Sequence, residues 1–139
     1  MAFNHQNTGQ YRADLPYTMR TCSQCNEAKS LEGFYKRSGK RSHEYYSDCK
    51  KCFSIRVVER WIRVKKEAVA YKGGECMDCN NVFHYAVFEF HHRDPDAKEH
   101  AWRKVRQWSE TRRKAELDKC DLLCANCHRM RHVKMRDNT

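Results

Sequence analysis

The chain has 139 residues, of which 40% are hydrophobic and 33% charged, and its formal net charge is +10. This length allows one ordinary domain or two very small ones, and the composition argues against a single large apolar core. A surface this basic favours a polyanion, first of all DNA or RNA, as the partner. Residues 1–72 hold 15 Lys and Arg against 7 Asp and Glu, so the positive excess lies in the first half. A basic protein without such a partner is the plainer alternative.

The beginning of the chain lacks a basic region followed by an apolar stretch, as a secretory signal would have. No run of residues approaches the roughly 20 apolar residues of a membrane helix. We therefore expect a cytoplasmic protein with no membrane partner. In that reducing setting, paired cysteines indicate a metal more often than a disulfide.

The first half of the chain predicts an arm and a small module. Residues 1–19 are polar and are expected to form a flexible arm, and residues 20–53 a four-cysteine module. Within the module, the segment from Phe34 to Tyr46 predicts a hairpin with Gly39 near its turn. Basic and aromatic residues alternate there, as on a surface that binds phosphates and bases. We expect Phe34 and one tyrosine to form the small core.

Residues 54–72 predict a basic linker helix. The apolar residues Ile55, Val58, Ile62 and Val69 recur near helical spacing, and much of the remaining surface is Arg and Lys. The helix either lies along a DNA backbone or is a solvated spacer. Two glycines at 73–74 are expected to end it and to mark the boundary of a second domain, residues 73–139.

The second domain predicts further short elements. Val82–Phe90 is rich in β-forming residues and indicates a hairpin whose second strand ends at His91-His92. Residues 96–119 form a charged connection anchored by Trp102 and Trp108, with a helical part at 110–117. Asp121 is expected to cap a final helix over Leu122–Val133.

Eight of the nine cysteines form Cys-x-x-Cys pairs, a spacing that lets two thiolates of one turn bind the same zinc ion. Pairing in sequence order predicts two structural zinc sites, and crossed pairing or disulfides are the alternatives. The first site would be Cys22, Cys25, Cys49 and Cys52, and the second Cys76, Cys79, Cys124 and Cys127. Asn follows the first pair of each site and tolerates the left-handed backbone of such turns. Cys120 remains as a small buried residue.

Four histidines surround the second cysteine site. His91 and His92 stand at a strand end, and His128 and His132 are one turn apart on the final helix. A zinc ion that pins the helix to the hairpin would bring these histidines close together. Two alternatives stay open. Adjacent strand residues face opposite sides, which would give one of the pair a structural role. In the other alternative, His128 itself replaces a cysteine as a zinc ligand.

The segments Phe88–Pro95 and Cys120–Arg129 together resemble the HNH endonuclease family, in particular its zinc-stapled branch in phages, homing endonucleases and bacterial genomes. The resemblance covers residues 75–132, and the module from Cys22 to Cys52 resembles accessory zinc fingers of some phage members. It implies a small, zinc-stabilised α+β fold: a ββα-metal (HNH) domain preceded by a four-cysteine zinc-finger module and the basic linker helix.

The resemblance also implies roles for the histidines. His91 and His128 would bind a catalytic divalent ion with His132 as a third ligand, and His92 would be the general base. The ion is expected to be Mg²⁺ or Mn²⁺, and Ni²⁺ or Zn²⁺ also suits a His-rich site. The asparagine that the family uses to orient the base has Lys119 or Cys120 in its place, which leaves open how His92 is held.

The expected function is metal-dependent hydrolysis of double-stranded DNA, by nicking or double-strand cleavage, in a monomer or homodimer. One biological role that fits this expectation is that of a phage homing endonuclease, which would act in the host cytoplasm. Predicted DNA contacts are Lys36, Arg37, Lys40, Arg41, Arg56, Arg60, Arg63, Arg93, Lys119 and Arg129. The alternatives are a catalytically inactive zinc-finger DNA-binding protein and a zinc-dependent adaptor for an acidic protein partner.

Overall fold

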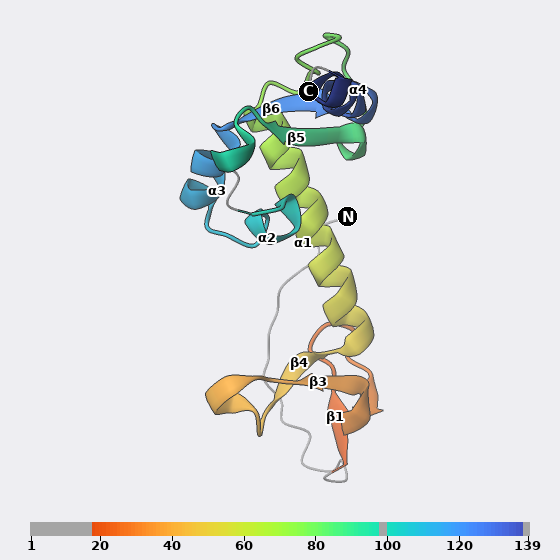
Figure 1. Cartoon of the computed structure of the whole chain (residues 1–139). Coiled ribbons are helices and arrows are strands. Elements are labelled where there is room, and N and C mark those ends of the chain that lie inside the picture. Colours follow the sequence, from red (N-terminus) through yellow and green to blue (C-terminus); the bar gives the residue numbers. More distant parts are fainter. Residues whose placement is uncertain (1–17, 98–99, 138–139) are drawn as a thin grey trace. The chain divides into compact units, whose positions relative to one another are not determined.

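The computed structural model describes residues 18–97 and 100–137 and divides into two compact units. The first unit ends at Val57 and the second begins at Val58, inside one long helix (Figure 1). The expected arm lies almost entirely outside the described residues. The division into arm, module, linker helix and nuclease domain stays a prediction.

The first unit is made of two small antiparallel sheets. β1 (Met19–Thr21) pairs with β2 (Ala28–Ser30), and β3 (Phe34–Lys36) pairs with β4 (Tyr45–Cys49). The connection between β3 and β4 contains Gly39 at φ 67°, a backbone angle that suits glycine. Phe34 is buried against two cysteines, with Tyr45 packed beside them. The predicted hairpin and its Phe-Tyr core are therefore confirmed.

Helix α1 (Lys50–Tyr71) begins four residues before the expected start at residue 54. The chain turns directly from β4 into the helix, so that Cys49 ends the strand and Cys52 lies in the first helical turn. The helix ends as predicted, because Gly73 and Gly74 take positive φ and the N–H of Gly74 bonds to the carbonyl of Val69. Neither α1 nor any other helix in the described residues is both long and apolar enough to cross a membrane.

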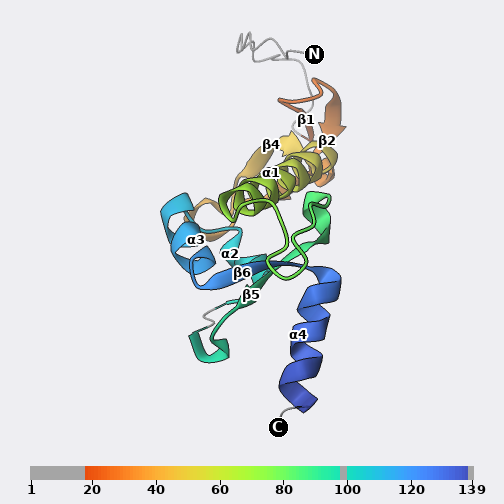
Figure 2. The ribbon, with the colours of Figure 1, turned by 90° about the horizontal axis from the view of Figure 1, so that it is seen from above.

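The second unit is built on one pair of strands and the helix that follows them. β5 (Phe88–His92) pairs antiparallel with β6 (Cys120–Cys124), and the chain then enters α4 (Ala125–Asp137). Figure 2 shows the two strands side by side and α4 continuing from the end of β6. The short helices α2 (Trp102–Val105) and α3 (Glu110–Leu117) lie in the connection. The core beneath the strands contains Phe88, Leu122 and Leu123 from the strands and Val69 from α1.

The predicted local hairpin over residues 82–92 is wrong. Val82 makes only an isolated bridge with Glu75, and Tyr85–Val87 is a 3₁₀ turn. Val82 is 75% exposed and Val87 39% exposed, so a strand here would bury little apolar surface. β5 instead pairs with β6, whose five residues are all buried.

The predicted start of the final helix is also wrong. Residues 120–124 are a strand, and α4 begins at Ala125, so Asp121 is not a helix cap. Asp121 lies opposite His91 in the strand pair and is buried. Burial on both faces of β6, through Leu122 and Leu123, outweighs the capping preference of Asp121. The helix predicted at 110–117 is confirmed with the same bounds.

Candidate functional site

The eight paired cysteines gather into two clusters. Within each cluster, the four sulfur atoms all lie within 4.8 Å of one another. One cluster holds Cys22, Cys25, Cys49 and Cys52, and the other holds Cys76, Cys79, Cys124 and Cys127. This is the expected sequence-order pairing, and all nine cysteines are free thiols. Cys120 is buried outside both clusters, as predicted.

The first pair of each cluster lies in a tight turn that ends on asparagine. Asn26 has φ 56° and Asn80 has φ 54°, the left-handed conformation that the sequence predicts. The N–H of Asn26 bonds to the carbonyl of Cys22, and that of Asn80 to the carbonyl of Cys76. These turns aim both thiols of a pair toward the same point.

Backbone N–H groups surround the first sulfur of each cluster. The N–H of Cys49 donates to Cys22 Sγ at 3.2 Å, and the N–H of Cys124 donates to Cys76 Sγ at 3.2 Å. Burial alone would raise the pKa of Cys22 and Cys76, but N–H donors bring each down to about 6.

The last sulfur of each cluster behaves in the opposite way. Contacts with the neighbouring thiols, first of all Cys49 and Cys124, raise the pKa of Cys52 and Cys127 to about 12. Four sulfurs this close become thiolates together only when a cation neutralises them. Four thiolates in a cage of this size are the donor set that structural Zn²⁺ prefers. Both clusters can therefore hold structural zinc ions.

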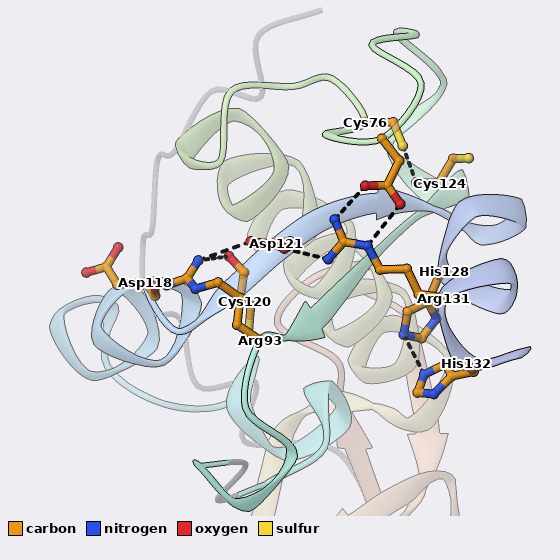
Figure 3. A network of polar contacts seen from close by, with 10 residues as sticks. Cys76, Arg93, Asp118, Cys120, Asp121, Cys124, His128, Arg131 and His132 are labelled. Atoms are coloured by element: carbon orange, nitrogen blue, oxygen red, sulfur yellow. Dashed lines mark hydrogen bonds and ion pairs between the residues drawn. The ribbon is translucent and has the colours of Figure 1, made fainter. Parts of the chain in front are cut away.

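A third group of possible metal ligands contains three histidines. His91 comes from β5, and His128 and His132 come from α4; their ligand nitrogens lie within 4.8 Å of one another. The Nε2 atoms of His128 and His132 are 3.2 Å apart (Figure 3). His91 is 8% exposed, and burial together with the two neighbouring imidazoles lowers its pKa. The neutral imidazole is the form that binds a metal ion.

Glu89, which the sequence analysis did not single out, is bonded to one of these histidines. Its carboxylate contacts Nδ1 of His128, leaving Nε2 on the side of His132. A carboxylate on the far ring nitrogen is the usual partner of a metal-binding histidine, because it fixes the tautomer and the ring orientation. The alternation of side chains along β5 places Glu89 and His91 on the same face, and this spacing was the available indication.

Arg131 of α4 joins the cysteine turn to the strand pair (Figure 3). Its Nη1 donates to Asp121 of β6 at 2.6 Å, and its Nε donates to Asp78, inside the Cys76–Cys79 turn, at 2.9 Å. Arg93 donates to the other oxygen of Asp121 at 3.1 Å. Burial works to raise the pKa of Asp121, but the two guanidinium groups hold it below the ordinary value. The helix that carries His128 and His132 is thus fixed against both neighbours.

His92 does not join the histidine cluster. Its Nε2 lies 2.8 Å from Oε1 of Glu116 in α3, whereas His91 meets the rings of α4. The two adjacent histidines therefore face different elements, as strand alternation requires. Glu116 was missed by the sequence analysis, because nothing in the spacing of residues 92 and 116 connects them.

Six of the ten predicted DNA-binding residues have an acidic partner within the protein. Arg37 and Arg41 meet Glu44, Arg56 meets Asp48, Arg63 meets Glu67, Arg93 meets Asp121, and Lys119 meets Glu116. Lys36 lies over the ring of Tyr45. For Lys40, Arg60 and Arg129, which are exposed, no ion pair is seen among the described residues. These three side chains are the most available for an outside anion.

A groove runs beside α4 next to the histidine cluster. It is lined by Pro95, Arg129, His132, Val133, Met135 and Arg136. The groove combines one possible metal ligand with two basic side chains, which suits an anionic ligand.

Comparison of the chain with protein-family models, with curated proteins and with solved structures found no match. The fold is a small mixed α/β structure with two four-cysteine clusters that can hold zinc.

Proposed function

We propose that this protein is a metal-dependent endonuclease that hydrolyses DNA phosphodiester bonds at the histidine cluster of the second unit, in the manner of HNH nucleases. The observation that carries the proposal is the meeting of His91 with His128 and His132 where the β5–β6 strand pair packs against α4. Three nitrogen donors leave coordination positions open for oxygens of a phosphate and of water.

Each neighbouring group has a task in this proposal. A divalent ion held by the three histidines would polarise the scissile phosphate and stabilise charge on the leaving oxygen. His92, the residue after His91 at the end of β5, is assigned as the base that accepts the proton of the attacking water. Glu89 keeps the ring of His128 in its ligating orientation. Arg129, in the groove beside His132, contacts a neighbouring phosphate.

The partner and the ion follow from charge and donor chemistry. A net charge of +10 favours a polyanion as the partner. The exposed Lys40 and Arg60, together with Arg129, are the proposed contacts to the phosphate backbone of the DNA. Mg²⁺ prefers oxygen ligands, so a site with three imidazoles favours Mn²⁺, Ni²⁺ or Zn²⁺ over it. A monomer with one such centre nicks one strand, and a double-strand break needs two events.

The test is cleavage of supercoiled plasmid by zinc-loaded protein with added Mg²⁺, Mn²⁺ or Ni²⁺, or with none added. We expect ion-dependent conversion to nicked circles. His132→Ala removes one ion ligand and His92→Ala removes the base, and each should lower the rate by at least about 100-fold. His43→Ala is the matched control, because this ring lies outside the cluster and its side chain is 75% exposed.

The same experiment separates the alternatives. Plasmid that is bound but not cut in any of the ions, with affinity that falls steeply as salt rises, would contradict the nuclease and favour an inactive zinc-finger DNA-binding protein. Equal cleavage by wild type and His132→Ala would place the activity outside the histidine cluster.

A further inference from the structure

We infer that Glu116 positions His92 for proton transfer; the inference rests on the proposed nuclease function and deepens it. The sequence has Lys119 or Cys120 where HNH nucleases use an asparagine to orient the base, and the structure instead places the carboxylate of Glu116 against His92. Glu116 comes from α3 rather than from the connection before β6.

The pair is close and enclosed. Oε1 of Glu116 lies 2.8 Å from Nε2 of His92, and the side chains are 4% and 10% exposed. A carboxylate so well shielded from water interacts more strongly with its partner than a surface carboxylate does. Removing it would take away the contact that fixes the χ2 angle of the His92 ring.

The contact also selects one tautomer of His92. An ionised carboxylate only accepts hydrogen bonds, so the proton of the neutral ring stays on Nε2 and donates to Glu116. Nδ1 then keeps its lone pair, which is what a general base needs to accept a proton from water. A buried carboxylate that fixes the tautomer of a catalytic histidine acts in the same way in serine hydrolases.

Two further contacts hold Glu116 itself. Nζ of Lys119 donates to the second carboxylate oxygen at 2.8 Å, which favours the ionised form. The thiol of Cys120 donates to the backbone carbonyl of Glu116 at 3.4 Å, and Cys120 is the residue opposite His92 in the strand pair. The end of α3 is thus tied to β6 beside the histidine that its carboxylate contacts.

A cavity borders the pair. It has a volume of about 100 Å³ and is lined by His92 and Glu116 together with Phe90, Trp102 and Leu117, among others. This volume is several times what one water molecule needs, and the two polar side chains offer it hydrogen bonds. The cavity therefore has room for water beside the nearly buried ring of His92.

The experiment is a double-substitution cycle on plasmid nicking, measured as kcat and KM in the ion that supports the fastest cleavage. The variants are Glu116→Leu, His92→Ala and the two combined. Glu110→Leu is the control on the same helix, because the side chain of Glu110 is 68% exposed and pairs only with Lys114 among the described residues. Ni²⁺ affinity of the zinc-loaded protein and the melting temperature are measured for each variant.

We expect Glu116→Leu to lower kcat on the order of 100-fold, with KM and Ni²⁺ affinity within about twofold of wild type. In the His92→Ala background, the same change should have no further effect, because the group it positions is gone. Glu116→Gln, which keeps the shape, should fold like wild type and lose on the order of tenfold, since an amide no longer selects the tautomer.

Wild-type kcat in Glu116→Gln and Glu116→Leu would overturn this inference and leave the nuclease intact. Losses that multiply in the double variant would also overturn it, since they would mean that Glu116 acts independently of His92. Absence of cleavage by the wild type in every ion would overturn both the inference and the proposed function.

Discussion

The two four-cysteine modules of this chain, the first around Cys22–Cys52 and the second around Cys76–Cys127, are built alike and differ in the side chains that they present. In both, a turn carries the first cysteine pair, and the second pair lies where a strand passes into a helix. In both, a buried phenylalanine of the preceding strand stands opposite the cysteine that ends the second strand, Phe34 opposite Cys49 and Phe88 opposite Cys124. The same local structure therefore occurs twice.

The likeness extends to an ion pair between an arginine of the helix and a buried aspartate of the strand. Four residues after the last cysteine, the helix carries an arginine in each module: Arg56 bonds to Asp48 at 2.8 Å, and Arg131 bonds to Asp121 at 2.6 Å. Both aspartates are buried strand residues. The arginine fixes the helix to the strand in both modules.

The difference lies in three positions. Where the second module has His128 and His132, the first has Phe53 and Val57, at the same distances from the last cysteine. Three residues after the buried phenylalanine, β5 has His91, whereas the first module has Arg37 directly after the end of β3. The cysteine cluster thus provides the structure, and three substitutions on it separate a module with a possible ion site from one without.

The largest expected effect comes from loss of a cysteine ligand. Structural zinc contributes about 10–16 kcal/mol in small modules, which is as large as the whole stability of a domain. Cys124→Ser should unfold the second module and abolish Ni²⁺ binding at the histidines. Cys49→Ser should unfold the first module only, as measured by amide hydrogen exchange and Ni²⁺ titration.

The control for this comparison is Cys120→Ser, which changes the cysteine outside both clusters and should leave both modules folded. If Cys49→Ser abolished Ni²⁺ binding while Cys124→Ser preserved it, the second cysteine cluster would not be the one that supports the histidine site.

The next largest expected effect is the loss of stability when either helix arginine is replaced. Arg131→Met leaves the buried Asp121 with Arg93 as its remaining guanidinium partner among the described residues, and should lower the free energy of unfolding by about 2 kcal/mol. Arg56→Met should cost less, about 1 kcal/mol, because the hydroxyls of Ser23 and Ser47 still donate to Asp48. Urea unfolding of the two variants measures the difference, and an equal or reversed order would contradict this account of the network.

A third comparison concerns the residue that follows the last cysteine, which is Phe53 in the first module and His128 in the second. Phe53 packs edge-on against Tyr35 and Tyr46 at centroid distances of 5.4 and 4.9 Å. Phe53→Ala should therefore cost about 2 kcal/mol of stability and leave Ni²⁺ affinity unchanged. His128→Ala should change stability by less than about 1 kcal/mol and weaken Ni²⁺ binding on the order of 100-fold. Loss of stability without loss of Ni²⁺ binding in His128→Ala would make this histidine structural.

The smallest expected effect should be the same in both modules. Asn26→Ala and Asn80→Ala each place alanine in the left-handed conformation, at a cost of about 1 kcal/mol. Glycine at either position should be tolerated. Thermal unfolding with zinc bound measures both, and a large difference between them would show that the two turns are not equivalent.

The sequence predicted local structure best where a residue type strongly favours one backbone conformation or one kind of site. Paired cysteines, the asparagines after them and the glycines after α1 each predicted a local geometry that is present. The partner of β5 could not be predicted, because Val82–Phe90 has strand composition and only the fold shows that Val82 is exposed. The same limit explains Asp121, a good helix cap by type that burial places in a strand.

The site was predictable in part for a similar reason. Spacing brings His128 and His132 to one helix face, and the cysteine cluster brings that face to His91. The carboxylates that contact two of the histidines, Glu89 and Glu116, are far from them in the sequence. Glu89 is 39 residues from His128, and Glu116 is 24 residues from His92. Several predicted DNA contacts are paired within the protein, because pairing depends on neighbours that become adjacent only on folding.

The most direct test of the account is a count of metal sites. Elemental analysis should give two Zn²⁺ per chain in protein whose histidine site has been emptied by brief chelation, and calorimetric titration of this protein with Ni²⁺ should show one additional site. That site should disappear when His91, His128 and His132 are all changed to alanine, while both zinc ions remain. A wild-type protein without the additional site, or a site that survives in the triple variant, would contradict the account.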